Sequence, residues 1–328
     1  MGMGMCGDKM IDLIELEDVS CPLDCPESDE IVLTGQDMLR DLPGEFNIVK
    51  CRNCGLMRTN PRPTPDAIGF YYPEDYGPYV GTRVQHASQQ SASLINKLLR
   101  LIAKQVFNFN TNTLPTMLMP GRMLEVGCAS GAFLHQMAGL GWQVQGIEFS
   151  EKAAQAAAQL GYHVHAGALE TAPQPDEPFD LIVGWMVLEH LHDPIKGLQK
   201  LREWAKPNAW LVLSVPNAGA ESFRFFKSNW HDLHLPNHLY HFTPTALEKM
   251  LSASGWKLEK VHHQRVLGSL IASTGYILRD KGFTKLGNKL ISFPEKAGRW
   301  NQVLYPLAWL LSVFGQTGRM TVWARVKT

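Results

Sequence analysis

Short apolar segments alternate with helical segments between residues 122 and 215, and this alternation restricts the possible folds more than any other feature of the sequence. Apolar periodicity predicts strands at 122–127, 143–149, 163–166, 179–185 and 210–215, with helices at 131–140, 151–160 and 194–205. Strands and helices that alternate at this spacing form a doubly wound, mostly parallel α/β sheet. Ligands of such sheets bind at the carboxyl ends of the strands, so we expect the functional residues there.

The overall charge of the chain is balanced, because its 328 residues include 31 Lys and Arg residues and 31 Asp and Glu residues. Nucleic-acid-binding proteins need an excess of positive charge, so nucleic acid is not an expected partner. No apolar run reaches the roughly 20 residues that a membrane-spanning helix needs. Residues 1–10 lack the basic start and apolar stretch of a signal peptide. We therefore expect a cytoplasmic protein, and peripheral contact with a membrane stays open.

Four of the six cysteines lie in two close pairs within the first 54 residues. Three residues separate Cys21 from Cys25, two separate Cys51 from Cys54, and Gly55 follows where a tight knuckle turn needs glycine. Four thiolates gathered in this way bind one Zn²⁺ in tetrahedral geometry. We predict a structural zinc ribbon; the alternative is four buried or free thiols that are paired only in sequence.

The sequence divides into two predicted domains. Residues 1–82 would contain the zinc ribbon and a connector rich in Pro, Tyr and Gly, and residues 83–328 would contain the α/β sheet. An amphipathic helix is expected at 91–107, where apolar residues recur at helical spacing. Cys6 is expected to be a free thiol of the N-terminal tail.

A glycine turn, Gly127-Cys-Ala-Ser-Gly131, follows the first predicted strand and opens a helix. Its glycines do not fit the G-x-G-x-x-G register of dinucleotide sites, and no Gly-Lys-Ser/Thr follows to make a P-loop. Glu125, expected at the mouth of the site, would repel a pyrophosphate but can pair with a cationic amino-acid group. Glu148 ends the second strand, where an acid can bind both ribose hydroxyls. A ligand with ribose and positive charge but without phosphate is S-adenosylmethionine.

The ordered motifs resemble those of class I S-adenosylmethionine-dependent methyltransferases, in the subgroup with an N-terminal zinc ribbon. LEVGCASGAFL is similar to the family's first motif, with Ala129 in place of the commoner glycine. GIEFS resembles the ribose-binding strand end, and FDLIVGWMVLEHLHDP resembles the fourth-strand motif. CRNCGLMRTNPRPTP and PNHLYHFTPTALEKML also resemble the family, so the similarity covers roughly residues 20–262. The central part resembles ubiquinone-pathway O-methyltransferases.

This resemblance implies a seven-stranded Rossmann-like methyltransferase sheet and a set of cofactor contacts. Glu125 and the turn would hold the methionine part of the cofactor, and Glu148 would hold the ribose. Phe149, Ala168 and Leu169 would line the adenine pocket, although Phe149 could instead be core and the other two a helix start. The complete set of implied cofactor contacts is Glu125, Gly127, Cys128, Ala129, Ser130, Gly131, Glu148, Phe149, Ala168, Leu169 and Trp185.

Histidines are the expected acceptor-side residues. Methyl transfer to a hydroxyl requires removal of its proton, and histidine is the natural base near neutral pH. His190 follows the fourth strand, and residues 230–241 hold four more of the twelve histidines. We predict His190 at the transfer site, with His238 and His241 as acceptor contacts on a movable lid. Loop histidines that only shape the lid, or a histidine metal site, are the alternatives.

The last third holds more than a simple methyltransferase sheet requires. Final strands are expected at 256–262 and 320–326, with a helical insertion at about 264–318 between them. Apolar segments at 267–278 and 303–314, with lysines between them, suit an interfacial hairpin or a cap over an apolar acceptor. A helical subdomain packed on the sheet or on a second copy of the chain is the alternative.

The leading interpretation is a methyltransferase that acts on a small-molecule, glycan or lipid-linked acceptor, at oxygen. A sugar C-methyltransferase-like enzyme and a non-catalytic scaffold whose ribbon docks a partner are the competing interpretations. An NAD-dependent enzyme is disfavoured by the glycine register.

Overall fold

A seven-stranded mixed sheet is the centre of the computed structural model, which describes residues 14–72, 113–115 and 118–327. The strand order is β12-β13-β10-β9-β6-β7-β8. Only β13 runs against its neighbours, between β10 and β12. The strands are β6 (Arg122–Val126), β7 (Gln143–Glu148), β8 (His163–Ala166), β9 (Phe179–Trp185), β10 (Ala205–Pro216), β12 (Trp256–His263) and β13 (Arg319–Val326).

Helices cover both faces of this sheet because its strands alternate apolar side chains between two cores. Met123, Leu181 and Val212 pack with α4 (Ala132–Ala138) and α5 (Glu151–Gln159). Their neighbours in sequence point to the other face, which α6 (Pro194–Glu203) and α8 (Pro244–Ala253) cover. Three of these four helices, α5, α6 and α8, begin at a residue whose side chain caps them; Ser150, for example, accepts a hydrogen bond from the Ala153 N–H.

The predicted sheet is therefore confirmed, with strand bounds close to those expected. The largest difference is β10, which begins at Ala205 rather than at residue 210 and pairs with β9 through an irregular register. The predicted helix at 91–107, Cys6 and the expected boundary between residues 82 and 83 lie outside the described residues.

A second sheet forms from the N-terminal region and is completed by a distant strand. Its order is β11-β4-β3-β2, built from β2 (Asp29–Gly35), β3 (Phe46–Cys51), β4 (Met57–Thr59) and β11 (Tyr240–His241). β1 (Leu16–Glu17) pairs separately with β5 (Arg62–Pro63). Because β11 comes from the segment after β10, the N-terminal sheet is joined to the central domain by backbone hydrogen bonds.

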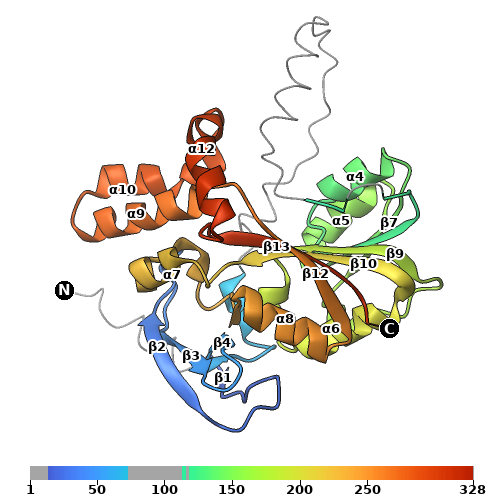
Figure 1. Ribbon diagram of the computed structural model, residues 1–328, viewed down its shortest axis with the longest axis horizontal. Helices are drawn as coiled ribbons and strands as arrows, with labels where there is room; N and C mark the ends of the chain where they lie inside the picture. Colours follow the sequence, from blue (N-terminus) through green and yellow to red (C-terminus); the bar gives the residue numbers. More distant parts are fainter. Residues whose placement is uncertain (1–13, 73–112, 116–117, 328) are drawn as a thin grey trace, which may run out of the picture.

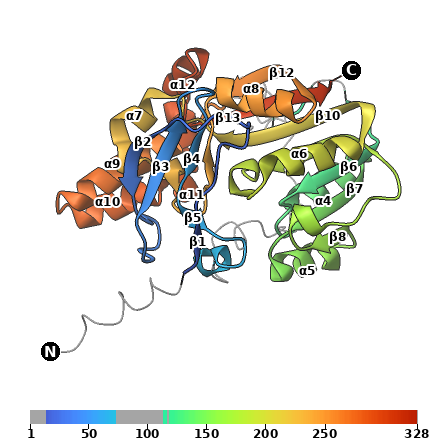
Figure 2. The ribbon, with the colours of Figure 1, turned by 90° about the horizontal axis from the view of Figure 1, so that it is seen from below.

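Four helices lie between β12 and β13: α9 (Gly268–Asp280), α10 (Thr284–Ile291), α11 (Phe293–Lys296) and α12 (Trp300–Val313). α9 and α10 approach very closely, since a Cβ on Gly275 would lie 2.7 Å from the carbonyl oxygen of Gly287. Figures 1 and 2 show α9 and α10 at the end of the molecule opposite α4 and α5. The predicted insertion is confirmed, and none of the described helices is long and apolar enough to cross a bilayer.

Candidate functional site

The glycine turn after β6 is held at the carboxyl edge of the sheet. The Gly127 and Cys128 N–H groups both donate to the Ile147 carbonyl of the neighbouring strand β7. Gly127 has φ +71°, and a Cβ there would lie 2.5 Å from the Val187 side chain, so only glycine fits. Ala129 also has positive φ, +46°, where the related motif commonly has glycine. The alanine is thus accommodated in a left-handed conformation, which the surrounding hydrogen bonds fix.

Glu148 fastens the turn from the end of β7. Its carboxylate accepts hydrogen bonds from the Ala129 N–H and the Ser150 N–H, each at 2.8 Å. Burial raises the pKa of Glu148, and these backbone N–H groups oppose that rise. A carboxylate has about four acceptor positions, so both oxygens keep capacity for ribose hydroxyls.

Glu125 lies behind the turn and not at its mouth, which corrects the sequence-based expectation. Its side chain is 3% exposed, and its Oε2 has no hydrogen-bond partner among the described residues. Burial, and then the nearby Glu148 charge, raise the pKa of Glu125 to about 8. Glu125 is therefore a neutral carboxyl group at pH 7. A cationic ligand bound beside it would favour its ionised form.

Among the other predicted cofactor contacts, some side chains are exposed to solvent and others are buried. The Phe149 ring is 54% exposed and lies 6.1 Å from the Tyr72 ring, so Phe149 is not a core residue. Cys128 instead turns its side chain inward beneath Gly146, leaving only its backbone toward the turn. Ser130 and Gly131 complete the turn, and the Gly131 N–H donates to the Cys128 carbonyl.

The remaining two strand ends supply Ala168, Leu169 and Trp185. Ala168 is half-buried at the start of a 3-10 turn, and Leu169 behind it is buried. The preceding Gly167 N–H donates to the Glu148 carbonyl, which brings this turn beside the predicted ribose site. Trp185 packs on the Phe133 ring at 5.2 Å, and its indole N–H has no partner among the described residues.

His190 meets two residues that are distant in sequence. Its Nδ1 lies 2.7 Å from the Tyr72 hydroxyl and 2.9 Å from the Asn237 carbonyl oxygen. Because a carbonyl oxygen only accepts, Nδ1 carries the proton and Nε2 carries the lone pair. Burial lowers the pKa of His190 to about 4, so the imidazole is neutral at pH 7.

Glu189 and His238 complete a buried cluster around His190. The His238 ring lies 4.7 Å from the His190 ring, and its Nδ1 donates to the Asp232 carbonyl at 2.8 Å. Glu189 is fully buried, and neither carboxyl oxygen has a partner among the described residues. Burial raises the pKa of Glu189 to about 8. One ligand atom from each of the three residues lies within 4.8 Å of the others, so the cluster could hold a divalent cation or a shared proton.

The sequence did not single out Glu189 or Tyr72 for a role. Glu189 precedes His190 in the fourth-strand motif FDLIVGWMVLEHLHDP, and no neighbouring residue indicates its burial. Tyr72 stands in the Tyr-rich connector, 118 positions from His190. Only the fold brings these residues together.

His241 is placed differently from the expectation of a movable lid residue. It lies in strand β11, is 1% exposed, and directs Nε2 to the Thr59 hydroxyl at 3.3 Å. His241 is therefore fixed between the lid segment and the N-terminal sheet, outside the Glu189–His190–His238 cluster. His238 is also buried rather than on an exposed loop.

The four predicted zinc ligands meet in the N-terminal region. Single sulfur atoms of Cys21, Cys25, Cys51 and Cys54 all lie within 4.8 Å of one another. The Leu56 N–H points at the Cys54 sulfur at 3.5 Å, and the Gly55 N–H donates to the Cys51 carbonyl, as in a knuckle turn. Although burial opposes it, backbone N–H groups lower the pKa of Cys51 to about 7. Four converging thiols with N–H donors aimed at sulfur fit a tetrahedral Zn²⁺.

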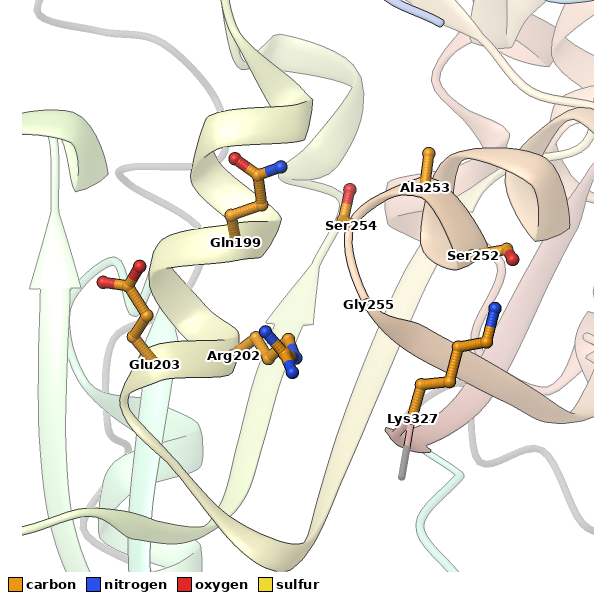
Figure 3. Close-up of a pocket in the computed structure, with 8 residues that line it drawn as sticks. All are labelled: Gln199, Arg202, Glu203, Ser252, Ala253, Ser254, Gly255 and Lys327. Atoms are coloured by element: carbon orange, nitrogen blue, oxygen red, sulfur yellow. The ribbon is translucent and has the colours of Figure 1, made fainter.

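A polar groove of about 510 Å³ lies elsewhere, between the end of α6 and the turn after α8 (Figure 3). Arg202 and Glu203 line it from α6, and Lys327 lines it from the chain end. Helix α6 ends where β10 begins, so this groove is at the amino edge of the parallel strands. Cofactors of doubly wound sheets bind at the opposite edge, which separates the groove from the site described above.

Comparison with known proteins relates this chain to methyltransferases. Residues 87–261 match a family described as a methyltransferase domain. Ubiquinone biosynthesis O-methyltransferases of Thiobacillus denitrificans and Nitrosospira multiformis are 32% and 31% identical to this chain over 110 and 111 residues. Each match covers 31% of this chain, and 47% and 46% of the two relatives, so the chain spans about half the length of the curated relatives it matches.

Solved structures of methyltransferases are also similar. An S-adenosylmethionine-dependent methyltransferase from Mesorhizobium loti is 18% identical, with a TM-score of 0.42. The superposition covers 65% of this chain and 93% of that protein.

Proposed function

We propose that this chain, which belongs to the methyltransferase-domain family, transfers a methyl group from S-adenosylmethionine to a hydroxyl oxygen of a small-molecule, glycan or lipid-linked acceptor. The chain is a class I S-adenosylmethionine-dependent methyltransferase. The observation that carries the acceptor proposal is the neutral His190 imidazole, which the Asn237 carbonyl orients. The named activity of the ubiquinone O-methyltransferase relatives supports oxygen as the methylated atom.

The cofactor would lie across the carboxyl ends of β6 and β7. We assign the ribose hydroxyls to Glu148 and the methionine ammonium to the region of Glu125 and the turn. The exposed Phe149 ring would flank the adenine. This arrangement is supported by two buried carboxyl groups, which favour a cationic ligand without phosphate over a dinucleotide.

The chemistry would be an in-line displacement at the sulfonium methyl group. The acceptor oxygen forms the new bond to carbon, the carbon–sulfur bond breaks, and S-adenosylhomocysteine leaves. The hydroxyl proton passes to the lone pair of His190 Nε2, and the Tyr72 hydroxyl can orient the acceptor. The pKa of about 4 keeps His190 neutral and able to accept a proton at pH 7, but it also makes the imidazole a weaker base than an ordinary histidine. The role therefore rests on the position of Nε2 and on the Asn237 carbonyl that orients the ring.

Zn²⁺ bound to the four cysteines would be structural, because four thiolates leave no open coordination position. Free thiols suited to zinc are typical of reducing compartments, which supports a cytoplasmic location.

Cofactor binding tests the first part of the proposal. S-adenosylhomocysteine should raise the melting temperature of the protein, and NAD should not. Gly127→Arg should weaken S-adenosylhomocysteine binding by at least about tenfold, because a large side chain at this turn has no room. An affinity within twofold of wild type would place the cofactor elsewhere.

Replacement of His190 tests the second part. With an acceptor in hand, His190→Ala should lower turnover by about 10²–10⁴-fold, the usual contribution of a positioned base, while S-adenosylhomocysteine affinity stays near wild type. His192→Asn is the matched control, since His192 belongs to the same segment but bonds the Pro63 carbonyl. Full turnover in His190→Ala would show that another group removes the proton.

A further inference from the structure

We propose that the C-terminal helices α9–α12 bind the surface of an anionic lipid bilayer and hold the acceptor site close to it. The binding surface is inferred independently of the enzymatic reaction. The link to the acceptor site rests on the proposed function.

Helix α12 presents an unusual surface for a protein surrounded by water. Residues 300–314 contain no Asp, Glu, Lys or Arg. Six large apolar side chains of the helix are between 46% and 66% exposed: Trp300, Val303, Leu307, Trp309, Leu310 and Val313. A surface helix normally turns a charged face to solvent, and exposed apolar patches of this kind mark interaction sites.

The chemistry around this patch favours lipid as the partner. Residues 281–299, which precede α12, carry Lys281, Lys285, Lys289, Lys296 and Arg299 and only one acidic residue, Glu295. All five cationic side chains are exposed. Cationic residues beside an apolar patch with tryptophans match the headgroup and acyl layers of an anionic membrane. A protein partner would require no such excess of one charge.

The geometry fits a helix that lies on the bilayer. α12 has 14 residues, which gives a length of about 21 Å at 1.5 Å per residue. This is shorter than the roughly 30 Å hydrocarbon core. The apolar face would therefore enter the interface from one side, with the tryptophans near the headgroups.

Helix α9 of these C-terminal helices contacts the segment that holds the acceptor-site histidines. The α9 residue Ser273 accepts a hydrogen bond from the His231 N–H at 2.9 Å, and the His231 ring stacks on Tyr276 of α9. Ser269, also on α9, bonds the Asp232 carboxylate, and the Asp232 carbonyl holds His238. A bilayer that binds these helices would thus lie on elements that contact the histidine segment, which suits an acceptor with a lipid anchor.

Vesicle flotation of the full-length protein tests the inference. We expect wild-type protein to float with vesicles of phosphatidylcholine and phosphatidylglycerol, and less with phosphatidylcholine alone. Leu307→Glu combined with Leu310→Glu should lower the floated fraction by about tenfold or more, because charge is costly in the apolar layer. Lys285→Glu combined with Lys289→Glu should remove the preference for anionic vesicles, as should high salt.

Leu140→Glu is the matched control, because Leu140 is 60% exposed and follows α4 at the opposite end of the molecule. All variants should bind S-adenosylhomocysteine as wild type does, which separates lost membrane binding from lost folding or lost cofactor binding. Wild-type protein that does not float, or a Leu307/Leu310 variant that floats normally, would overturn the inference. A lipid-free dimer that only this variant dissociates, without vesicle binding, would identify the patch as a subunit interface instead.

Discussion

At the residue scale, Glu189 is a fully buried carboxyl group beside two neutral imidazoles. The Arg319 guanidinium favours its ionised form, but burial is the larger influence and holds its pKa near 8. Its Oε atoms have no donor among the described residues, so the group is accommodated as a neutral acid or by a bound cation. Because the pKa of such a buried acid differs between the folded and unfolded states, the stability of the protein depends on pH.

Glu189 should make the protein less stable as pH rises through neutrality. In the unfolded chain it ionises near its ordinary pKa of 4.5, whereas in the folded state it keeps its proton to about 8. Between these values Glu189 takes up a proton on folding, so its contribution to the free energy of unfolding falls with pH and levels off above 8. Histidines whose pKa is lowered by burial act in the opposite direction, because in the unfolded chain they are still half protonated at pH 6.5. Their contribution fades as pH approaches about 8, and wild type and a Glu189 variant share it.

Glu189→Gln should flatten this slope by up to about 1.4 kcal/mol per pH unit. Part of the slope should remain, because Glu125 contributes in the same direction. Urea unfolding at several pH values between 6.5 and 8 measures the effect. The exposed residue Glu203 provides a control, since Glu203→Gln should keep the wild-type slope. An unchanged slope in Glu189→Gln would mean that Glu189 is ionised in the folded protein.

At the element scale, the two cysteine knuckles and strand β3 form the predicted zinc unit. Cys51 ends β3, and the turn through Gly55 returns the chain to β4. Such short strands bury little apolar surface by themselves, so a metal is the usual source of stability in ribbons of this size.

Protein purified without added zinc should carry about one equivalent of the metal. Cys54→Ser should lose most of it, because three thiolates hold Zn²⁺ less tightly than four. Cys128→Ser should keep it, since Cys128 is buried beside Glu125 in the central domain. Elemental analysis decides between these outcomes. Wild-type protein that is folded, metal-free and rich in titratable thiols would refute the ribbon.

At the scale of the whole molecule, the N-terminal and central sheets share one hydrophobic core. Phe46 and Leu56 of the N-terminal region belong to the same buried cluster as Leu211 and Leu213 of β10. Strand β11, which follows β10 in the chain, pairs with β4 of the N-terminal sheet, and the Asn237 side chain donates to the Tyr71 carbonyl at 2.9 Å. The ribbon therefore supports the acceptor side of the site as well as its own fold.

Removal of zinc should accordingly destabilise the whole molecule. A strong chelator should lower the temperature of a single calorimetric transition, and a loss of a few kcal/mol corresponds to roughly 5–10 °C in a chain of this size. S-adenosylhomocysteine affinity should fall less than turnover, because the N-terminal sheet contacts the segment that holds His238 and His241 through β11. Two separate transitions, with only the smaller one sensitive to chelator, would show that the sheets unfold independently.

The sequence by itself determined the features that depend on neighbouring residues. Apolar periodicity predicted the strands of the central sheet, the spacing of the cysteines predicted their convergence, and the turn from Gly127 predicted the position of the cofactor edge. Only the tertiary structure decided that Glu125 is buried and that His241 belongs to the N-terminal sheet. It also decided that Tyr72 meets His190, 118 positions away. The physical reason is that periodicity and turn chemistry act over a few residues, whereas burial and hydrogen-bond partners depend on which distant segments pack together.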